Sequence, residues 1–91
     1  MNYEFVATKK FTRDVRRMKK RGADLSLLRD VIDRLLAGET LEPRYRDHAL
    51  TGDYAGFREC HVRPDWLLVY IVRETELILV GVGTGSHSDL F

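Results

Sequence analysis

Apolar and polar residues alternate at the start of the chain. Tyr3, Phe5 and Ala7 occupy every second position, and Glu4 lies between the first two. A period of two places the three apolar side chains on one side of an extended backbone. The pattern therefore predicts a first β-strand.

The next segment has the spacing of an amphipathic helix. Phe11, Val15 and Met18 recur four and three residues apart, and most positions between them hold Arg. One stripe of such a helix faces a core while its basic side chains face water. Thr8 can cap the start of this helix, and Gly22 can end it.

A second helix is predicted between Asp24 and Gly38, and a loop follows it. The buried face of the helix is expected to carry Leu28, Val31, Ile32, Leu35 and Leu36. Because few residues separate the two helices, we expect them to form a helical hairpin. Residues 39–54 combine Pro, Gly and many charges without a sustained period, which predicts a structured loop.

Three further strands are predicted over residues 55–62, 66–73 and 76–82. Their connections, at residues 63–65 and 74–75, are short enough to require antiparallel pairing. The last two strands are apolar at nearly every position, which favours the middle of a sheet with both faces at least partly covered. The final nine residues, GTGSHSDLF, are expected to form a Gly-rich turn and a short tail.

The predicted order β-α-α-β-β-β describes an α+β protein. We expect a small antiparallel sheet with the helical hairpin packed on one face, so that the other face is free for function. Along the strand at 55–62, Phe57, Glu59 and His61 point to one face and Cys60 to the other, so Cys60 and His61 cannot share a ligand site. The 91 residues, 44% hydrophobic and 32% charged, fit one domain over residues 1–91.

Charge is distributed unevenly along the chain. Residues 1–21 hold eight Lys or Arg and two acidic residues, a net charge of +6, whereas the other 70 residues hold seven and twelve, a net charge of −5. A basic helix on a slightly acidic domain fits a polyanion or an acidic partner. A helix face that is merely solvated explains the same charges.

The sequence also indicates a cellular location. No apolar run approaches the roughly 20 residues of a membrane span, and the N-terminal MNYEFVATKK lacks the hydrophobic region of a signal peptide. We therefore expect a cytoplasmic protein without membrane contact. The single Cys60 excludes an internal disulfide and is compatible with a reducing compartment.

Three histidines and one aspartate are the candidates for chemistry. His48 lies in the predicted loop, His61 and Asp65 flank a strand turn, and His87 lies in the tail. A sheet can gather these groups at one end, where imidazoles and a carboxylate divide acid and base roles near neutral pH. Metal-ligand spacings such as C-x2-C are missing, so we expect an acid–base reaction without a cofactor. Histidines without a catalytic role would fit the same pattern.

Two aromatic residues lie near these candidates. Trp66, the only Trp of the chain, follows Asp65 and could stack on a nucleobase or pack in the core. The apolar pair Leu90 and Phe91 is expected to dock on the protein rather than extend into water.

Longer strings of residues resemble a known family. EPRYRDHALTGDYAGFRECHVRPDWLLVY and the final GTGSHSDLF resemble the YafQ branch of the RelE-like toxins, the ribosome-dependent mRNA interferases of type II toxin–antitoxin systems. The resemblance extends from the first strand to the tail and implies the RelE-like microbial RNase fold. It implies an endoribonuclease that needs no metal and cuts mRNA in the ribosomal A site. In that reaction the 2′-hydroxyl attacks the adjacent phosphate and leaves a cyclic phosphate and a 5′-hydroxyl.

The resemblance also implies roles for individual residues. His87 would be the general acid, Asp65 or His61 the base, and His48 an orienting group or a phosphate contact. The residues that would contact RNA are Trp66, Phe91, Arg63, Arg44 and Arg46 and the basic first helix, because Lys and Arg suit phosphate groups.

One position departs from the family pattern. The family commonly has an arginine two residues before the glycine that precedes the SHSDLF segment, whereas this chain has Gly83 there. That arginine is expected to neutralise the phosphate in the transition state. Either another cation such as Arg63 replaces it, or the toxin is attenuated, naturally or by deliberate inactivation.

The implied partners are mRNA, the ribosome and an antitoxin. By resemblance the antitoxin is a ribbon-helix-helix protein with an acidic, partly disordered C-terminal region, and operator DNA is contacted only through it. The alternative is a non-catalytic binder on the same scaffold. Such a binder would resemble the gyrase-poisoning toxins, or a toxin kept only for antitoxin binding and operon repression.

Overall fold

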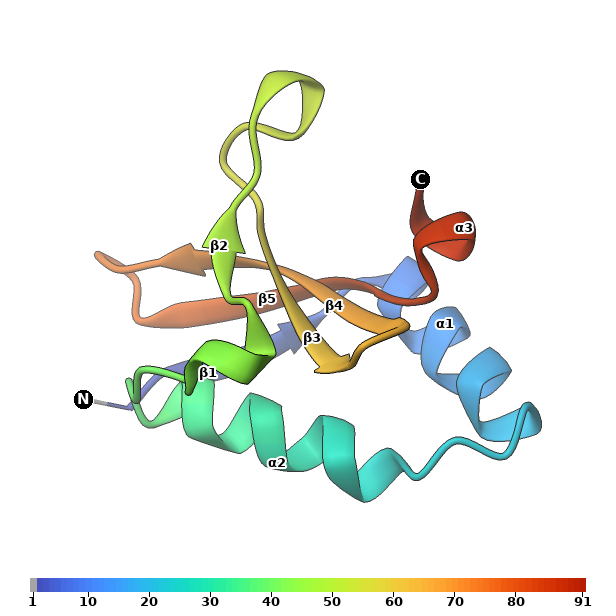
Figure 1. The fold of residues 1–91 in the computed structure, drawn as a ribbon. Helices are drawn as coiled ribbons and strands as arrows, with labels where there is room; N and C mark the ends of the chain where they lie inside the picture. The colour runs from blue at the N-terminus through green and yellow to red at the C-terminus, as the bar shows by residue number, and fades with distance from the viewer. Residues whose placement is uncertain (1) are drawn as a thin grey trace.

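A five-stranded sheet forms the centre of the computed structural model, which describes residues 2–91 (Figure 1). The strands are β1 (Glu4–Ala7), β2 (His48–Ala49), β3 (Arg58–Arg63), β4 (Trp66–Arg73) and β5 (Ile78–Gly85). They lie side by side in the order β1-β5-β4-β3-β2, so the apolar β4 is central. The two edge strands are the shortest, and short edges limit pairing with other chains.

Two helices, α1 (Lys9–Lys20) and α2 (Leu25–Leu36), form the predicted helical hairpin. The Thr8 hydroxyl accepts a hydrogen bond from the Phe11 N–H at 3.0 Å and donates one to the Val82 carbonyl at 3.0 Å. The cap of α1 therefore also attaches the helix to β5. Asp24 caps α2 by accepting a hydrogen bond from the Ser26 N–H.

The main core lies between the hairpin and one face of the sheet, as the sequence predicts. It contains Phe11, Met18, Leu28, Val31, Leu35, Leu41, Tyr45, Cys60, Trp66, Leu68, Tyr70 and Leu79. Leu67 and Val69 alternate with the core residues of β4 and point to the opposite face, yet they are buried as well. The opposite face is thus partly covered, and a short helix, α3 (His87–Leu90), packs against β5 there (Figure 1).

The direction of β1 corrects the predicted sheet. β1 pairs with β5 in parallel, from Glu4 opposite Ile78 to Ala7 opposite Gly81, whereas an antiparallel sheet was expected. The other three ladders are antiparallel. A short turn dictates direction only between consecutive strands, and β1 is separated from β5 by most of the chain.

Two segments predicted to be irregular contain regular structure. The loop at 39–54 includes β2 and two 3-10 turns, Pro43–Tyr45 and Gly52–Tyr54. The tail forms α3, because the Ser86 hydroxyl accepts from the Asp89 N–H while the Asp89 carboxylate accepts from the Ser86 N–H. The S-x-x-D spacing was a signal for this helix that the sequence interpretation did not use.

The last predicted strand, residues 76–82, corresponds to β5 and extends further than expected, to Gly85. Its glycines fit because neighbouring side chains occupy the space beside them: a Cβ on Gly81 would lie 2.6 Å from the Phe5 ring. Within residues 2–91, none of the helices has the length and apolar character needed to cross a membrane.

Candidate active site

Pairing of β2 with β3 brings a histidine and a glutamate together. His48 lies opposite Glu59 in the ladder, and Glu59 and His61 are two residues apart on the same face of β3. Oε1 of Glu59 lies 3.6 Å from His48 Nε2 and 3.9 Å from His61 Nε2. The Glu59 side chain is only 7% exposed, so its carboxylate faces the two imidazoles rather than water.

Backbone carbonyls fix the orientation of both rings. His48 Nδ1 lies 2.6 Å from the Arg46 carbonyl, and His61 Nδ1 lies 3.1 Å from the Pro64 carbonyl. A carbonyl only accepts hydrogen bonds, so each Nδ1 carries the hydrogen and each neutral ring presents an unprotonated Nε2. Both Nε2 atoms are directed at Glu59, which would stabilise either ring once it takes up a proton.

The C-terminal helix supplies the other wall of the site. His48, Leu50, Glu59, His87 and Phe91 line a pocket of about 370 Å³. The ring centroids of His87 and Phe91 are 5.1 Å apart.

The loop between β2 and β3 contacts the C-terminal residue Phe91 through Tyr54. Tyr54 contacts Phe91 edge to face, with 4.9 Å between ring centroids, and both rings are more than 40% exposed. The pocket therefore offers an imidazole on each of two walls and exposed aromatic rings at its edge, which suits acid–base chemistry on a substrate with planar groups.

The remaining charged candidates lie elsewhere. Arg63 and Asp65 line a cavity of about 390 Å³ together with Arg21 and Ser86, on the α1 side of the β3–β4 turn. Arg46 lines a larger cavity of about 580 Å³, which is also lined by Asp47, Arg58 and Tyr70. The structure thus brings His48, His61 and His87 near Glu59 but separates Asp65, Arg63 and Arg46 from that pocket.

Trp66 is part of the core, one of the two roles that the sequence left open. Its side chain is 3% exposed, and its indole N–H donates to the Thr84 hydroxyl at 2.8 Å. Residues of β4 alternate between the faces, and Trp66 shares the helix side with Leu68. Of the two aromatic candidates, only Phe91 is exposed.

Cys60 is also confirmed on the helix side, away from His61. It is fully buried, and burial raises the pKa of its thiol to about 12. The thiol therefore stays protonated at neutral pH and is a poor nucleophile or ligand. Among residues 2–91, no group of three or more His, Cys, Asp or Glu side chains is placed to hold a metal ion.

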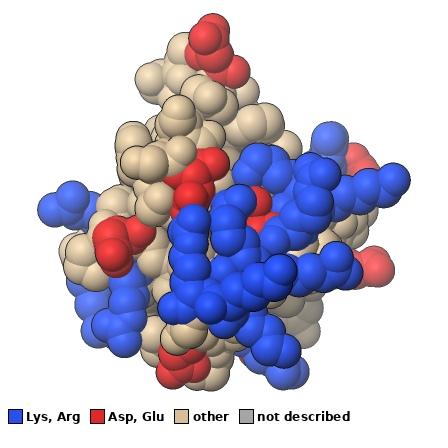
Figure 2. Space-filling model, turned by 90° about the vertical axis from the view of Figure 1, so that its right-hand side faces the viewer, with Lys and Arg blue, Asp and Glu red and all other residues tan. Residues whose placement is uncertain are grey.

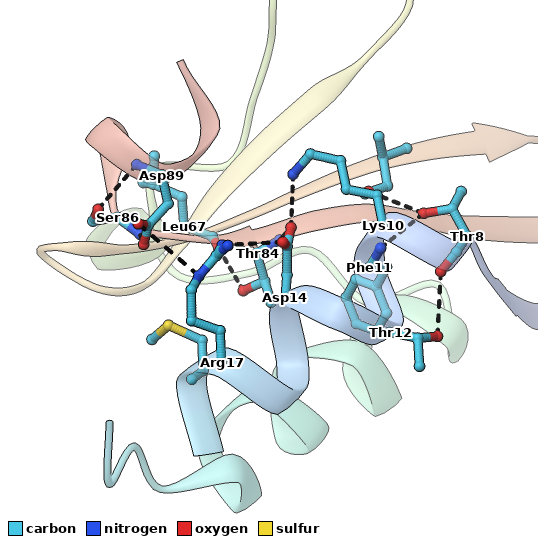
Figure 3. Close-up of polar contacts among 12 residues, drawn as sticks. Thr8, Lys10, Phe11, Thr12, Asp14, Arg17, Leu67, Thr84, Ser86 and Asp89 are labelled. Atoms are coloured by element: carbon cyan, nitrogen blue, oxygen red, sulfur yellow. Dashed lines mark hydrogen bonds and ion pairs between the residues drawn. The ribbon is translucent and has the colours of Figure 1, made fainter. Parts of the chain in front are cut away.

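Gly83 lies beside a lysine rather than an empty space. A Cβ at this position would be 2.9 Å from Lys10 Nζ, 3.0 Å from Asp14 Oδ2 and 3.2 Å from Leu90 Cδ2. Lys10 donates to the Asp14 carboxylate at 2.7 Å, and Asp14 is buried (Figure 3). A cation is thus present at the position where the family arginine is missing, although it comes from α1.

Basic side chains cover the side of the molecule that carries α1. Figure 2 shows Lys and Arg gathered there, on the side where Figure 1 also places α3. We call this surface the basic face; its exposed residues are Lys9, Lys10, Arg13, Arg16, Lys19, Lys20 and Arg21. It adjoins the helix that holds His87, so a polyanion bound to it would reach toward the pocket.

Sequence reasoning missed two residues of the site. Glu59 was placed on the same strand face as His61 but was given no role, and only the β2–β3 pairing shows that His48 joins them. Tyr54 lies in a loop without a periodic pattern, so no sequence signal pointed to its contact with Phe91.

Comparison with known proteins agrees with this fold. A family model described as bacterial toxin of type II toxin-antitoxin system, YafQ, matches residues 3–91. The mRNA interferase toxin YafQ of Escherichia coli K12 is 35% identical over 82 residues, which cover 89% of this chain and 87% of that relative.

Solved structures are similar over the whole chain. A metal-bound toxin from Helicobacter pylori is 44% identical, with a TM-score of 0.92 and full coverage of both chains. The E. coli DinJ–YafQ toxin-antitoxin complex contains a chain that is 30% identical, with a TM-score of 0.90 over 100% of this chain and 99% of that one. The chain therefore belongs to the YafQ family of bacterial toxins of type II toxin–antitoxin systems.

Proposed function

We propose that this toxin is a ribosome-dependent endoribonuclease that cuts mRNA in the ribosomal A site. The observation that carries the proposal is the pocket with His48 and Glu59 on one wall and His87 on the other. Relatives named mRNA interferase toxin give the reaction class. Since its target would be the ribosome, we expect the protein to act in the cytoplasm.

The proposed reaction needs one base and one acid. His48 Nε2 takes the proton of the 2′-hydroxyl while the 2′-oxygen bonds to the adjacent phosphorus, and Glu59 stabilises the resulting imidazolium. The bond from phosphorus to the 5′-oxygen breaks as protonated His87 gives that oxygen a proton. The products are a 2′,3′-cyclic phosphate and a 5′-hydroxyl, so no water or cofactor is consumed.

The geometry supports a different base from the two, Asp65 and His61, that the resemblance implied. Asp65 lines another cavity, whereas His48 faces His87 across the pocket. His61 contacts the same carboxylate from the side and would hold Glu59 in place or exchange a proton with it.

Exposed groups around the pocket suit RNA binding. The rings of Tyr54 and Phe91 would stack on mRNA bases, an interaction worth roughly 1 to 3 kcal/mol per base. The basic face and the exposed Arg44 would bind ribosomal RNA, because Lys and Arg replace the counterions of phosphate groups.

Lys10 is the cation that we assign to the phosphate in place of the missing arginine. Its ammonium adjoins the space next to Gly83 and its side chain is 46% exposed, so a substrate phosphate can approach it. Arg63, the candidate from sequence, lines two cavities that His87 does not line. A lysine presents a point charge rather than a planar fork, so an attenuated activity remains part of the proposal.

We further propose an acidic antitoxin as the partner. A similar chain forms a complex with the antitoxin DinJ in E. coli. A ribbon-helix-helix protein with an acidic C-terminal segment would match the basic face in charge, and operator DNA would be reached only through that antitoxin.

The test is primer extension on an mRNA translated in a purified system with added toxin. We expect cuts within A-site codons, and little cutting of the same mRNA without ribosomes. His87→Ala should reduce the rate about 10² to 10⁴-fold because the leaving oxygen loses its acid. Glu59→Gln should reduce it less, since the imidazole survives and only its stabilising charge is removed.

Two outcomes would contradict the proposal. Efficient cutting of naked RNA would exclude dependence on the ribosome. Absence of cutting by the unmodified toxin, together with normal antitoxin binding, would instead support the non-catalytic binder.

A further inference from the structure

The helix that carries His87 is too short to fix its own position. α3 has four residues, and isolated helices need about 12 to 15 residues to be even marginally stable. The placement of His87 and Phe91 against the pocket must therefore come from contacts that α3 makes with the rest of the protein.

Asp89 makes the contacts that order the start of α3. Its Oδ2 accepts from the Ser86 N–H at 2.8 Å. Gly85, at φ 152°, provides the room, since a Cβ there would lie 2.8 Å from the same oxygen. The backbone before α3 is thus shaped around the Asp89 carboxylate.

Arg21, at the end of α1, holds the same carboxylate from outside. Its two terminal nitrogens donate to Asp89 Oδ2 at 2.6 Å and to Oδ1 at 3.0 Å, a two-pronged arrangement that fixes orientation as well as distance. Arg17 Nε lies 4.0 Å from Oδ1 and adds a second positive charge (Figure 3).

A buried carboxylate makes α1 a firm support for this contact. Asp14 accepts from the Thr84 N–H of β5 at 3.1 Å and from Arg17 at 3.0 Å (Figure 3). The same helix is therefore attached to the strand before α3 by Asp14 and to α3 itself by Arg21. Displacing α3 would require breaking the Arg21 contact while β5 stays in place.

We propose that Arg21 is a positioning residue that fixes α3 through Asp89 and so sets the location of His87 and Phe91 relative to His48. The proposal rests on the proposed function. It predicts that Arg21 acts on the rate of the chemical step, although it lies on the basic face. An RNA-binding arginine would instead act on affinity for the ribosome.

The experiment compares Arg21→Ala, Arg21→Lys, Asp89→Asn and the double variant Arg21→Ala/Asp89→Asn. The control is Arg29→Ala, because Arg29 also forms a surface ion pair with an aspartate, but within α2. Asn at 89 retains an oxygen for the Ser86 N–H, so this variant removes the charge and spares the helix cap.

Two sets of readouts are required. Cleavage of ribosome-bound mRNA at several toxin concentrations gives two quantities. One is the rate constant at saturating toxin, and the other is the half-saturation concentration, at which the rate is half of that value. Solution NMR gives the Tyr54–Phe91 ring contact and the hydrogen exchange of the Leu90 and Phe91 amides, which bond to Ser86 and His87 carbonyls.

We expect Arg21→Ala to lower the saturating rate about tenfold to a hundredfold, with a half-saturation change below about twofold. The Tyr54–Phe91 contact should weaken, and the two amides should exchange faster. Arg21→Lys should recover part of the loss. The saturating rate of the double variant should be no lower than that of the more affected single variant, because both substitutions remove the same interaction between Arg21 and Asp89.

Other results would overturn the proposal. A raised half-saturation concentration with an unchanged rate would make Arg21 an RNA contact. A lower melting temperature with unchanged rate and ring contact would make it merely structural. If the unmodified toxin does not cleave mRNA, the proposed function fails, while unchanged NMR readouts in Arg21→Ala would separately refute the positioning role.

Discussion

In the proposed function, Lys10 of α1 would take the role of the arginine that the family commonly has at position 83. Gly83 has no side chain, and the ammonium of Lys10 occupies the volume next to it. In phosphoryl transfer, charge grows on the non-bridging oxygens, so a cation fixed at that point acts mainly on the transition state.

We predict that Lys10→Ala lowers A-site cleavage about 10² to 10³-fold, the usual cost of removing one stabilising group. Gly83→Arg in the Lys10→Ala protein should restore cleavage, because the Lys10→Ala change removes the nearest of the three side chains that a Cβ at position 83 would meet. Primer extension on translated mRNA measures both effects, and Arg29→Ala controls for the lost charge. Full activity of Lys10→Ala would show that another cation holds the phosphate.

Glu59 shows the limit of prediction at single residues. Alternation along β3 placed Glu59 and His61 on one face, which the structure confirms. The partner of Glu59, His48, lies in a segment without periodicity, and its two-residue strand depends on pairing that only the folded chain provides. The alternation of residues along a strand therefore predicts which side chains share a face of the sheet, but not which residues of the neighbouring strand lie beside them.

At the scale of elements, long periodic segments were predictable and short ones were not. The spacing of Phe11, Val15 and Met18 gave α1 because an amphipathic helix must bury one stripe. β1 has four residues, and its parallel direction follows from packing against β5 rather than from a turn. α3 depends on Asp89, whose partner Arg21 is 68 residues away in sequence.

The Asp89 contacts predict a dependence of stability on pH. Hydrogen bonds from Arg21, and then from Ser86, hold the pKa of Asp89 well below its usual range. The unfolded chain then binds a proton more readily, so the contribution to stability is complete above about pH 4 and is lost as the pH falls.

We therefore predict that Asp89→Asn lowers the free energy of unfolding at pH 6 and that this difference shrinks between about pH 4 and pH 2. Urea unfolding over this pH range measures it. Asp30→Asn, at an exposed position of α2, is the matched control. A difference that is constant with pH would mean that the charge of Asp89 contributes nothing.

At the scale of the whole molecule, the basic residues that are concentrated near the start of the chain lie together on one surface. The +6 charge of residues 1–21 appears as the basic face (Figure 2). Not every cation of the basic face is free: Lys10 pairs with the buried Asp14, and Arg21 pairs with Asp89. Arg13, Arg16 and Lys20 are exposed, so they are better choices for testing recognition.

We predict that changing Arg13, Arg16 and Lys20 to Glu slows association with an acidic antitoxin about tenfold or more at low salt. The difference should narrow as salt screens the charges. Stopped-flow mixing at several salt concentrations measures the rates, and Arg29→Glu with Arg73→Glu reverses charge away from the basic face. Equal rates for both proteins would place the antitoxin elsewhere.

The parallel pairing of β1 with β5 has a consequence for the order in which the toxin matures. The first strand along the described chain, Glu4–Ala7, pairs with residues 78–81, which are synthesised much later. Contacts so distant in sequence close slowly, and here they cannot begin before β5 has left the ribosome. The hydrogen bond from the Thr84 N–H to Asp14 needs β5, and α3 packs against the same strand. A nascent chain that still lacks β5 therefore has no assembled pocket, so under the proposed function it could not yet cut mRNA.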